Sequence, residues 1–354
     1  MEIALQLTKQ PKQKPTDESN LGFGKKFTDH MFIMDYSTEK GWYDPRIVPY
    51  GPIELDPSTM VLHYGQAIFE GLKAYRKSDG EILLFRPEKN MERINQSNER
   101  LCIPPIDVDF CIKVLKTFVD VERDWVPSSK GTSLYLRPFI IATDAFLGIH
   151  PSHTYKFIII ASPSGQYYPE GVNPVKIWVE TKYVRAVRGG VGASKTAGNY
   201  AASLKAQQEA EDAKYTQVLW LDGVERKYIE EVGTMNVFFV IDGEVITPML
   251  QGSILPGITR MSVIELLKHR GIKITERVIS IDEVYEAHAA GKLDEVFGTG
   301  TAAVISPIGE LNRGGNRITI NNNKTGPIAQ MLYDNITGIQ RGEIPDTFGW
   351  TQKV

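Results

Sequence analysis

The sequence has few cysteines, no long hydrophobic run and little net charge. Two cysteines, Cys102 and Cys111, among 354 residues are too few for a disulfide framework or a four-thiolate zinc site, and we expect both thiols to be buried. No run approaches the roughly 18 apolar residues that cross a membrane. The 40 lysines and arginines nearly balance the 43 aspartates and glutamates, giving a formal net charge of −3. We therefore expect no membrane, nucleic-acid or metal partner.

The first residues, MEIALQLTKQPKQKP, reach lysines and prolines before an apolar stretch of signal-peptide length forms, so we expect a cytoplasmic protein. Hydrophobic residues make up 42% and charged residues 23% of the chain, which is an ordinary globular balance. At about 150 residues per domain, the length predicts two domains. We expect a loosely held polar arm over 1–30, a small domain over 31–162, a linker over 163–174 and a large domain over 175–354.

Local patterns predict a mixture of helices and strands in each half. ILLFR is a strand candidate, Pro87 opens a helix through about Arg100, and Asp107 caps another helix. The second half contains two apolar strands, VKIWVE and TQVLWLD, and a hairpin that turns at Asp242-Gly243. Further helices are predicted over about 200–214, from Ile258 to the stop at Gly271, and near 326–340. Because strands and helices do not alternate strictly, the expected fold class is α+β.

The loop GGVGASKTAGNY around Lys195 is the most informative segment, because its glycines allow a close backbone approach. It is a near match to a nucleotide phosphate loop starting at Gly189, but Ser194 stands where the second glycine is required. A second interpretation is a lysine that forms an imine with an aldehyde cofactor. A third is a solvated loop lysine. The loop alone leaves all three open.

An aldehyde cofactor with a phosphate, such as pyridoxal phosphate, would also need an anion site, an acid beside its pyridine nitrogen and a donor near its ring hydroxyl. Ile258 and Thr259 fall in the first turn of a helix entered through Pro256-Gly257, where free N–H groups and the helix dipole attract an anion. The sequence therefore offers a phosphate site on physical grounds alone.

Six motifs occur in order along the chain: LHYGQAIFEGLKAYR, FRPEKNMERI, LYLRPF, GGVGASKTAGNY, EVGTMN with LPGITR, and FGTGTAAVISP. In this combination the chain resembles the branched-chain amino acid aminotransferases, members of the fold-type IV (class IV) aminotransferases, over about residues 30 to 350. The resemblance implies two α+β domains like those of D-amino acid aminotransferase, with pyridoxal 5′-phosphate between them, and a homodimer. It implies transfer of the amino group of leucine, isoleucine or valine to 2-oxoglutarate.

The resemblance also implies roles for individual residues. Lys195 is expected to carry the cofactor and to act as the catalytic base, and Glu231 to lie beside the pyridine nitrogen. Glu230 is the alternative acid, on the opposite face if the segment is a strand. The remaining cofactor-binding residues implied by the resemblance are Arg93, Tyr200, Thr234, Ile258, Thr259 and Thr301.

For the substrate, the turn at Thr301-Ala302 is expected by resemblance to receive the α-carboxylate, and Arg137 to accept the distal carboxylate of glutamate. The aromatic residues of the substrate site implied by the resemblance are Phe69, Tyr135, Tyr167 and, from a neighbouring subunit, Tyr64. The chain departs from relatives that carry Cys-x-x-Cys after this turn, because Ala303 and Ser306 occupy those positions.

The nearest alternatives are other enzymes of the same fold, D-amino acid aminotransferase and aminodeoxychorismate lyase. Tyr-x-Arg-Pro at 135–138 and the Gly-Gly-Val-Gly loop favour the branched-chain enzyme. The alternative from another class is a P-loop nucleotide-binding protein. The sequence does not distinguish among leucine, isoleucine and valine.

Overall fold

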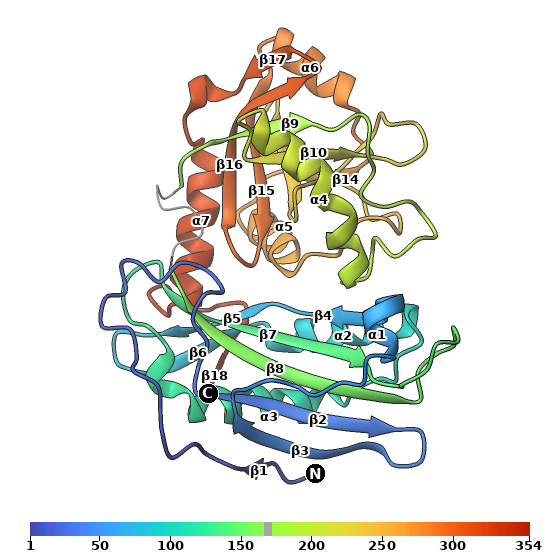
Figure 1. The fold of residues 1–354 in the computed structure, drawn as a ribbon. Helices are drawn as coiled ribbons and strands as arrows, with labels where there is room; N and C mark the ends of the chain where they lie inside the picture. The colour runs from blue at the N-terminus through green and yellow to red at the C-terminus, as the bar shows by residue number, and fades with distance from the viewer. Residues whose placement is uncertain (166–171) are drawn as a thin grey trace. The chain divides into compact units, whose positions relative to one another are not determined.

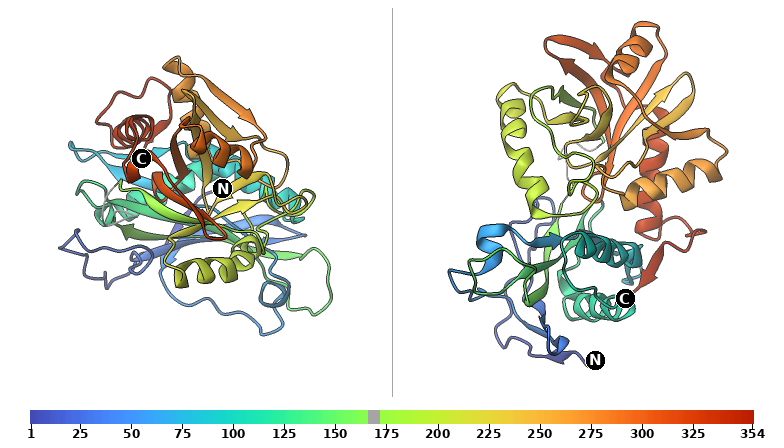
Figure 2. Two further views of the ribbon diagram at one scale, coloured as in Figure 1. Left: turned by 90° about the horizontal axis from the view of Figure 1, so that it is seen from above. Right: turned by 90° about the vertical axis from the view of Figure 1, so that its right-hand side faces the viewer.

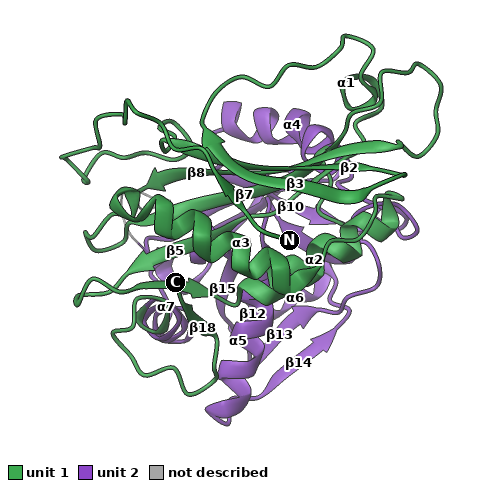
Figure 3. Ribbon diagram, turned by 90° about the horizontal axis from the view of Figure 1, so that it is seen from below, with its two compact units in different colours: residues 1–167, 194–197, 338–354 green, residues 168–193, 198–337 purple. Residues whose placement is uncertain are grey.

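The computed structural model describes residues 1–165 and 172–354, and the chain divides into two compact units (Figure 3). Unit 1 comprises Met1–Tyr167, Ser194–Ala197 and Gly338–Val354, and unit 2 comprises Tyr168–Ala193 and Gly198–Thr337. Each unit has its own sheet, with helices packed against it, so the predicted α+β class is confirmed.

Unit 1 is built on a sheet that is antiparallel apart from one parallel pair at its edge. Among the described residues the strand order is β1-β3-β2-β8-β7-β5-β6-β18, with β4 paired to β7 and β1 parallel to β3. The strands are β1 (Ala4–Leu5), β2 (His30–Ser37), β3 (Gly41–Pro49), β4 (Ala67–Phe69), β5 (Leu72–Arg76), β6 (Ile82–Phe85), β7 (Ser133–Ala142), β8 (Thr154–Ser164) and β18 (Thr351–Lys353).

Two helices of unit 1, α2 (Pro87–Arg100) and α3 (Val108–Val121), lie side by side against one face of this sheet (Figures 1 and 2). Both begin where the sequence predicts. Pro87 occupies the first helical position, and the Asp107 carboxylate accepts a hydrogen bond from the Phe110 N–H at 2.9 Å. The short α1 (Met60–Tyr64) and the 3₁₀ turn η1 (Arg123–Trp125) complete the helical part of the unit.

The end of the described chain belongs to unit 1, whereas the sequence analysis assigned residues 338–354 to the second domain. β18 pairs antiparallel with β6, and the Arg86 N–H donates to the Trp350 carbonyl at 2.6 Å. Trp350 is buried and stacks on Phe348, with ring centroids 4.2 Å apart, while its edge contacts Phe85. No local sequence pattern predicts this pairing, because β6 and β18 are far apart in the sequence.

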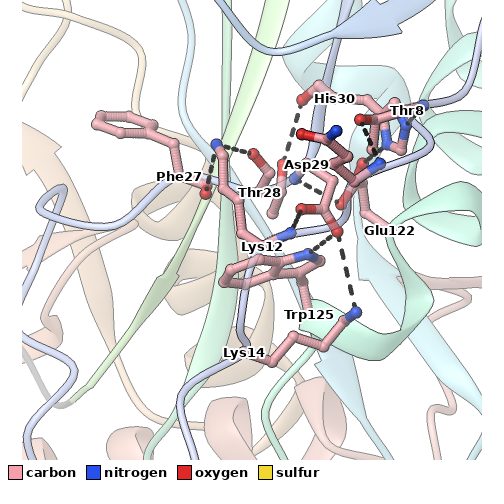
Figure 4. A network of polar contacts seen from close by, with 10 residues as sticks. Thr8, Lys12, Lys14, Phe27, Thr28, Asp29, His30, Glu122 and Trp125 are labelled. Carbon is pink, nitrogen blue, oxygen red and sulfur yellow. Dashed lines mark hydrogen bonds and ion pairs between the residues drawn. The ribbon is translucent and has the colours of Figure 1, made fainter.

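The amino-terminal arm, expected to be loosely held, makes an ordered set of polar contacts in unit 1 (Figure 4). The buried Asp29 carboxylate accepts hydrogen bonds from the Lys12 N–H at 2.7 Å and the Trp125 indole at 2.8 Å. His30 accepts from the Thr8 N–H at 2.9 Å through Nε2, while its Nδ1 lies 2.5 Å from Glu122. These contacts hold the arm against the sheet edge.

Unit 2 has a mixed sheet in which the described strands follow the order β11-β10-β9-β16-β15-β12-β13-β14, with β17 paired to β16. Three pairs are parallel, namely β9 with β10, β9 with β16 and β13 with β14. The strands are β9 (Val175–Val179), β10 (Gln217–Leu221), β11 (Ile229–Val232), β12 (Asn236–Ile241), β13 (Glu244–Pro248), β14 (Ile274–Arg277), β15 (Leu293–Gly300), β16 (Val304–Arg313) and β17 (Asn316–Thr319).

The predicted hairpin of unit 2 is confirmed: β12 and β13 are joined by Asp242 and Gly243, which both have positive φ, 53° and 77°. The predicted helices are present as α4 (Ala197–Asp212), α5 (Ile258–His269) and α7 (Pro327–Gln340) (Figure 1). Gly271, with φ 67°, follows the end of α5 as expected. The unit also contains α6 (Ile281–Ala289) and the 3₁₀ turn η2 (Asn321–Asn323).

One of the two thiols differs from expectation. Cys111 is buried in α3, where burial raises the pKa of its thiol, but Cys102 is exposed in the turn after α2. In the parts of the chain that the structure describes, helices are too short or too polar to cross a bilayer.

Candidate active site

Lys195 is fixed on both sides by the backbone and side chains of unit 1. Its N–H donates to the Ser97 hydroxyl of α2 at 3.0 Å, and its carbonyl accepts from the Phe69 N–H of β4 at 3.0 Å. The next residue, Thr196, forms a β-bridge with Ile68. The Lys195 Nζ lies 4.9 Å from the centroid of the Phe69 ring. The side chain of Lys195 is half-buried beside an aromatic ring, which argues against the interpretation as a solvated loop lysine.

Arg93, which the sequence alone would place on a solvated helix face, is buried and ion-paired. Its Nε and Nη2 donate to the two carboxylate oxygens of Glu70 at 2.7 and 2.9 Å, and Asn90 donates to Glu70 at 2.8 Å. Burial would raise the pKa of the Glu70 carboxyl, but Arg93, Lys195 and Asn90 together hold that pKa below its ordinary value. Asn90, Arg93 and Ser97 share one face of α2, so this helix aims its buried polar groups at the Lys195 segment.

The predicted aromatic and arginine side chains on β4 and β7 contact one another. The Arg137 guanidinium lies 4.8 Å from the Phe69 ring centroid, and its Nη2 donates to the Tyr135 hydroxyl at 3.0 Å. Gly71 makes room for that hydroxyl, since a Cβ at this position would lie 2.0 Å from it. Lys73 pairs with Tyr135 across the strands and so shares its face, and burial lowers the pKa of the Lys73 amine to about 8.

In unit 2, the acid predicted to serve the cofactor is buried and held by two partners. The Glu231 carboxylate accepts from the Leu255 N–H at 2.7 Å, and its other oxygen lies 3.4 Å from the Arg185 Nε. Its neighbour Glu230 contacts a different group, the Ser253 hydroxyl. Burial raises the pKa of the Glu230 carboxyl, although Ser253 and Arg185 oppose the shift. The two adjacent glutamates therefore have different hydrogen-bond partners, although the charge of Arg185 acts on both carboxyls.

The helix start predicted to bind an anion is buried and has no side-chain cap. Gly257, which has no side chain to offer, is the N-cap of α5, and Ile258 and Thr259 are 5% and 6% exposed. Asn236 secures the approach to the helix, because its amide donates to the Leu255 carbonyl at 2.9 Å. A Cβ on Gly257 would lie 2.0 Å from the Asn236 side-chain oxygen, so glycine is required there. This geometry suits an anion at the first turn.

Thr301 and Ala302 form the turn between β15 and β16 and are half-buried. Tyr200 is half-buried in the first turns of α4, and Thr234 is exposed in the turn closed by Val232 and Met235. Tyr64 ends α1, is 42% exposed and donates its hydroxyl hydrogen to the Leu147 carbonyl. Tyr167 lies outside the described residues.

Three charged residues were missed by sequence reasoning: Glu70, Lys73 and Arg185. Glu70 and Lys73 lie in the motif FEGLK, whose spacing around Gly71 could have drawn attention to them. Arg185 lies ten residues before Lys195 in a loop that follows no regular period, and no signal in the sequence pointed to it.

Asp144, His150 and His153 form a group whose possible ligand atoms lie within 4.8 Å of one another, although the sequence suggested no metal site. His153 and Thr154 donate hydrogen bonds to Asp144 at 2.9 and 2.8 Å, and the His150 Nδ1 lies 2.8 Å from the Pro151 carbonyl oxygen.

Comparison with known proteins defines the family. The amino-transferase class IV family matches residues 67–311, and the chain belongs to this family. Within it, the chain belongs with the branched-chain-amino-acid aminotransferases. It is 63% identical to branched-chain-amino-acid aminotransferase 2 of Bacillus subtilis (strain 168) over 99% of this chain and 97% of that protein. It is 56% identical to branched-chain-amino-acid transaminase 1 of the same organism over 97% of this chain and 96% of that protein.

Solved structures agree with this assignment. The branched-chain amino acid aminotransferase of Escherichia coli is 27% identical, with a TM-score of 0.76, and the match covers 92% of this chain and 98% of that one. Another branched-chain amino acid aminotransferase, solved with pyridoxamine 5′-phosphate, is 27% identical, with a TM-score of 0.75 over 91% of this chain and 97% of that one. The family takes the place of the P-loop interpretation of the glycine loop.

Class IV aminotransferases depend on pyridoxal 5′-phosphate, and the residues of this chain fit that cofactor. Lys195 would supply an amine on a backbone that is held at both sides, and Glu231 would supply a buried acid for a ring nitrogen. The uncapped first turn of α5 supplies N–H donors for a phosphate, in a place where Gly257 could not bear a side chain.

Proposed function

We propose that this chain is a branched-chain amino acid transaminase that moves the amino group of L-leucine, L-isoleucine or L-valine to 2-oxoglutarate. The observation that carries the proposal is the buried arrangement around Lys195, in which Phe69, Ser97 and the Glu70–Arg93 ion pair surround the one lysine of the glycine loop. Identity of 63% to a named branched-chain enzyme supports the substrate class.

The proposed chemistry divides between the cofactor and the protein. Pyridoxal phosphate, when bound, supplies an electron sink that stabilises negative charge at the substrate Cα. As a general base, the Lys195 Nζ would take the proton from the substrate Cα and pass it to C4′ of the cofactor, and it would carry a proton the opposite way in the second half-reaction. Glu231 keeps a proton on the pyridine nitrogen, and Tyr200 donates to the ring oxygen. Arg93, Ile258, Thr259 and Thr301 hold the phosphate end, and Thr234 is a further residue of the cofactor site.

The proposed substrate site must hold a branched apolar side chain in one half-reaction and a glutamate side chain in the other. Phe69, Tyr135 and Tyr167 supply apolar ring surface with hydroxyls at the edges, which can serve both. Arg137 binds the distal carboxylate of glutamate, in keeping with its guanidinium standing beside Phe69 and Tyr135. The N–H groups at Thr301 and Ala302 bind the α-carboxylate.

A panel of L- and D-amino acids with 2-oxoglutarate tests the reaction. We expect turnover with L-leucine, L-isoleucine and L-valine and none with their D-forms; the reverse would indicate a D-amino acid aminotransferase, and pyruvate release from aminodeoxychorismate would indicate the lyase. Lys195→Ala should abolish turnover, with Lys205→Ala, on the exposed face of α4, as the control. Borohydride reduction should place the cofactor on the peptide that contains Lys195, and modification elsewhere would contradict the proposal.

We also propose that the chain acts as a cytoplasmic homodimer in which Tyr64 of one copy serves the site of the other. The exposure of Tyr64, with its hydroxyl tied to the 146–149 loop, supports this role. Sedimentation of the active enzyme should give the mass of two chains, and activity in a monomer would contradict the proposal.

A further inference from the structure

Arg185 connects three segments of unit 2, namely β11, the glycine loop before Lys195 and the 252–257 segment before α5. Its side chain is 8% exposed, although the residue lies in a loop. Its Nε lies 3.4 Å from the Glu231 carboxylate, and its Nη2 donates to the carbonyls of Gly192, at 3.3 Å, and Ser253. Gly192 lies in the loop that leads to Lys195, and Ser253 precedes the N-terminus of α5.

The backbone around these contacts is closely packed. A Cβ on Gly192 would lie 2.2 Å from the Ser253 carbonyl oxygen, so the glycine loop and the 252–257 segment touch where Arg185 binds them both. Two residues further on, the Leu255 N–H donates to Glu231. One guanidinium thus holds the acid, the loop before the lysine and the approach to the anion-binding helix in a single arrangement.

The charges around Arg185 favour Glu231 as its ionised partner. The titratable groups that face this position are Glu231 and Glu230 on β11, with Asp222 acting on Glu230 from a greater distance. Burial and the neighbouring Glu231 raise the pKa of Glu230, so the positive charge of Arg185 is directed mainly to Glu231. A guanidinium beside a buried carboxylate favours the ionised carboxylate, which is the form that can pair with a protonated ring nitrogen.

We propose that Arg185 is a positioning residue for the cofactor: it keeps Glu231 charged and in place, and it fixes the two loops that flank it. Arg185 itself need not touch the cofactor. The proposal rests on the proposed role of Glu231 and goes beyond it, because it assigns the control of that acid to a residue in a different loop.

Equilibrium binding of pyridoxal phosphate to the apoenzyme tests this role without measuring turnover. Arg185→Met should raise the dissociation constant about tenfold or more, because the buried carboxylate of Glu231 loses its counter-charge. Arg185→Lys keeps the positive charge and should bind with an intermediate constant. Partial rescue by lysine distinguishes the charge of Arg185 from a merely structural role of its side chain.

Arg188→Met is the matched control, because Arg188 lies three residues away in the same loop region, is exposed and donates to the Gln251 side chain. It should leave cofactor binding unchanged, and binding weakened as much as in Arg185→Met would contradict the proposal. If circular dichroism shows that Arg185→Met does not fold, cofactor binding to Arg185→Lys tests the proposal instead. A dissociation constant equal to that of wild type in that variant would overturn the proposal.

A double-substitution cycle separates this proposal from the assignment of Glu231. Glu231→Gln should weaken cofactor binding by itself, and adding Arg185→Met to it should cost less than about threefold, because the two residues act together. If Arg185→Met weakens cofactor binding by the same factor with Glu231 as with Gln at that position, the proposed role of Arg185 is wrong. The assignment of Glu231 would still stand in that case. Unchanged binding in Glu231→Gln would instead show that the assignment of Glu231 is wrong, and this proposal with it.

Discussion

Glu70 is a fully buried carboxylate whose charge is balanced by the bidentate Arg93 and supported by Asn90 and the Gly71 N–H. Burying two charges is costly, and such a pair persists only when both members are well paired. Arg93 and Glu70 both lie in motifs of the sequence, but their pairing could not be predicted, because the two residues are 23 positions apart and carboxylates are usually exposed. The sequence thus indicated individual residues of this region more readily than it indicated which of them contact one another.

Removing the charge of Glu70 should destabilise the protein strongly at neutral pH. Glu70→Gln leaves a buried guanidinium without its counter-charge, which costs about 3–5 kcal/mol of unfolding free energy. Because the folded-state pKa of Glu70 is below its ordinary 4.5, its stabilisation is present above pH 4.5 and is lost as the pH falls through the folded-state value. Urea unfolding of both proteins should therefore show a difference that narrows below pH 4.5; a constant difference would contradict the ion-pair account.

Gly71 offers a test of the aromatic part of the site. Gly71→Ala would place a methyl group 2.0 Å from the present position of the Tyr135 hydroxyl, so the ring must move and its hydrogen bond with Arg137 must break. We expect kcat/KM to fall by at least about tenfold, because small displacements of positioning groups have large effects on rate. Gly51→Ala, where a Cβ meets nothing within 4 Å, is the control. Equal kinetics in the two variants would show that Tyr135 does not position substrate.

At the scale of elements, local signals predicted the helices and the hairpin well. Pro87 and Asp107 mark the starts of α2 and α3, and Asp242-Gly243 needs the positive φ of its turn. These features depend on neighbours within a few residues. The ordered arm could not be predicted in the same way, because Asp29, Glu122 and Trp125 hold it through contacts across 17 to 96 residues.

The arm contacts can be tested by proteolysis. Asp29→Ala removes the acceptor of both the Lys12 N–H and the Trp125 indole, so the arm should detach more often (Figure 4). Limited trypsin digestion should then cut after Lys9 or Lys12 severalfold faster than in wild type. Asp17→Ala is the control, because Asp17 accepts hydrogen bonds from Ser19, only two residues away. Unchanged cleavage in Asp29→Ala would show that other contacts hold the arm.

At the scale of the whole molecule, the chain contributes to unit 1 up to Tyr167, again at Ser194–Ala197 and finally at Gly338–Val354, which includes β18. The intervening segments form unit 2. A boundary drawn from linkers and composition assumes that each domain is continuous in sequence, so it assigned the returning segment to the second domain. The unit to which such a segment belongs depends on its tertiary pairing, which no local sequence pattern reveals.

Trp350→Ala should reveal how much unit 1 depends on its returning strand. The indole is 3% exposed between Phe85 and Phe348, and its truncation should cost about 3–5 kcal/mol. Hydrogen exchange should show increased opening of β6 and its neighbours in unit 1, with little change in unit 2. Uniform loss of protection in both units would contradict this local dependence.

The pairing of β18 with β6 also has a consequence for synthesis on the ribosome. Gln352 donates a hydrogen bond to Glu88, which is translated 264 residues earlier. The edge of β6 that pairs with β18 therefore stays unpaired while unit 2 is synthesised. An uncovered strand edge is a site of mispairing with other nascent chains. Folding of unit 1 during translation therefore stays incomplete until Thr351–Lys353 has been made, and that interval is when we expect this protein to need a chaperone most.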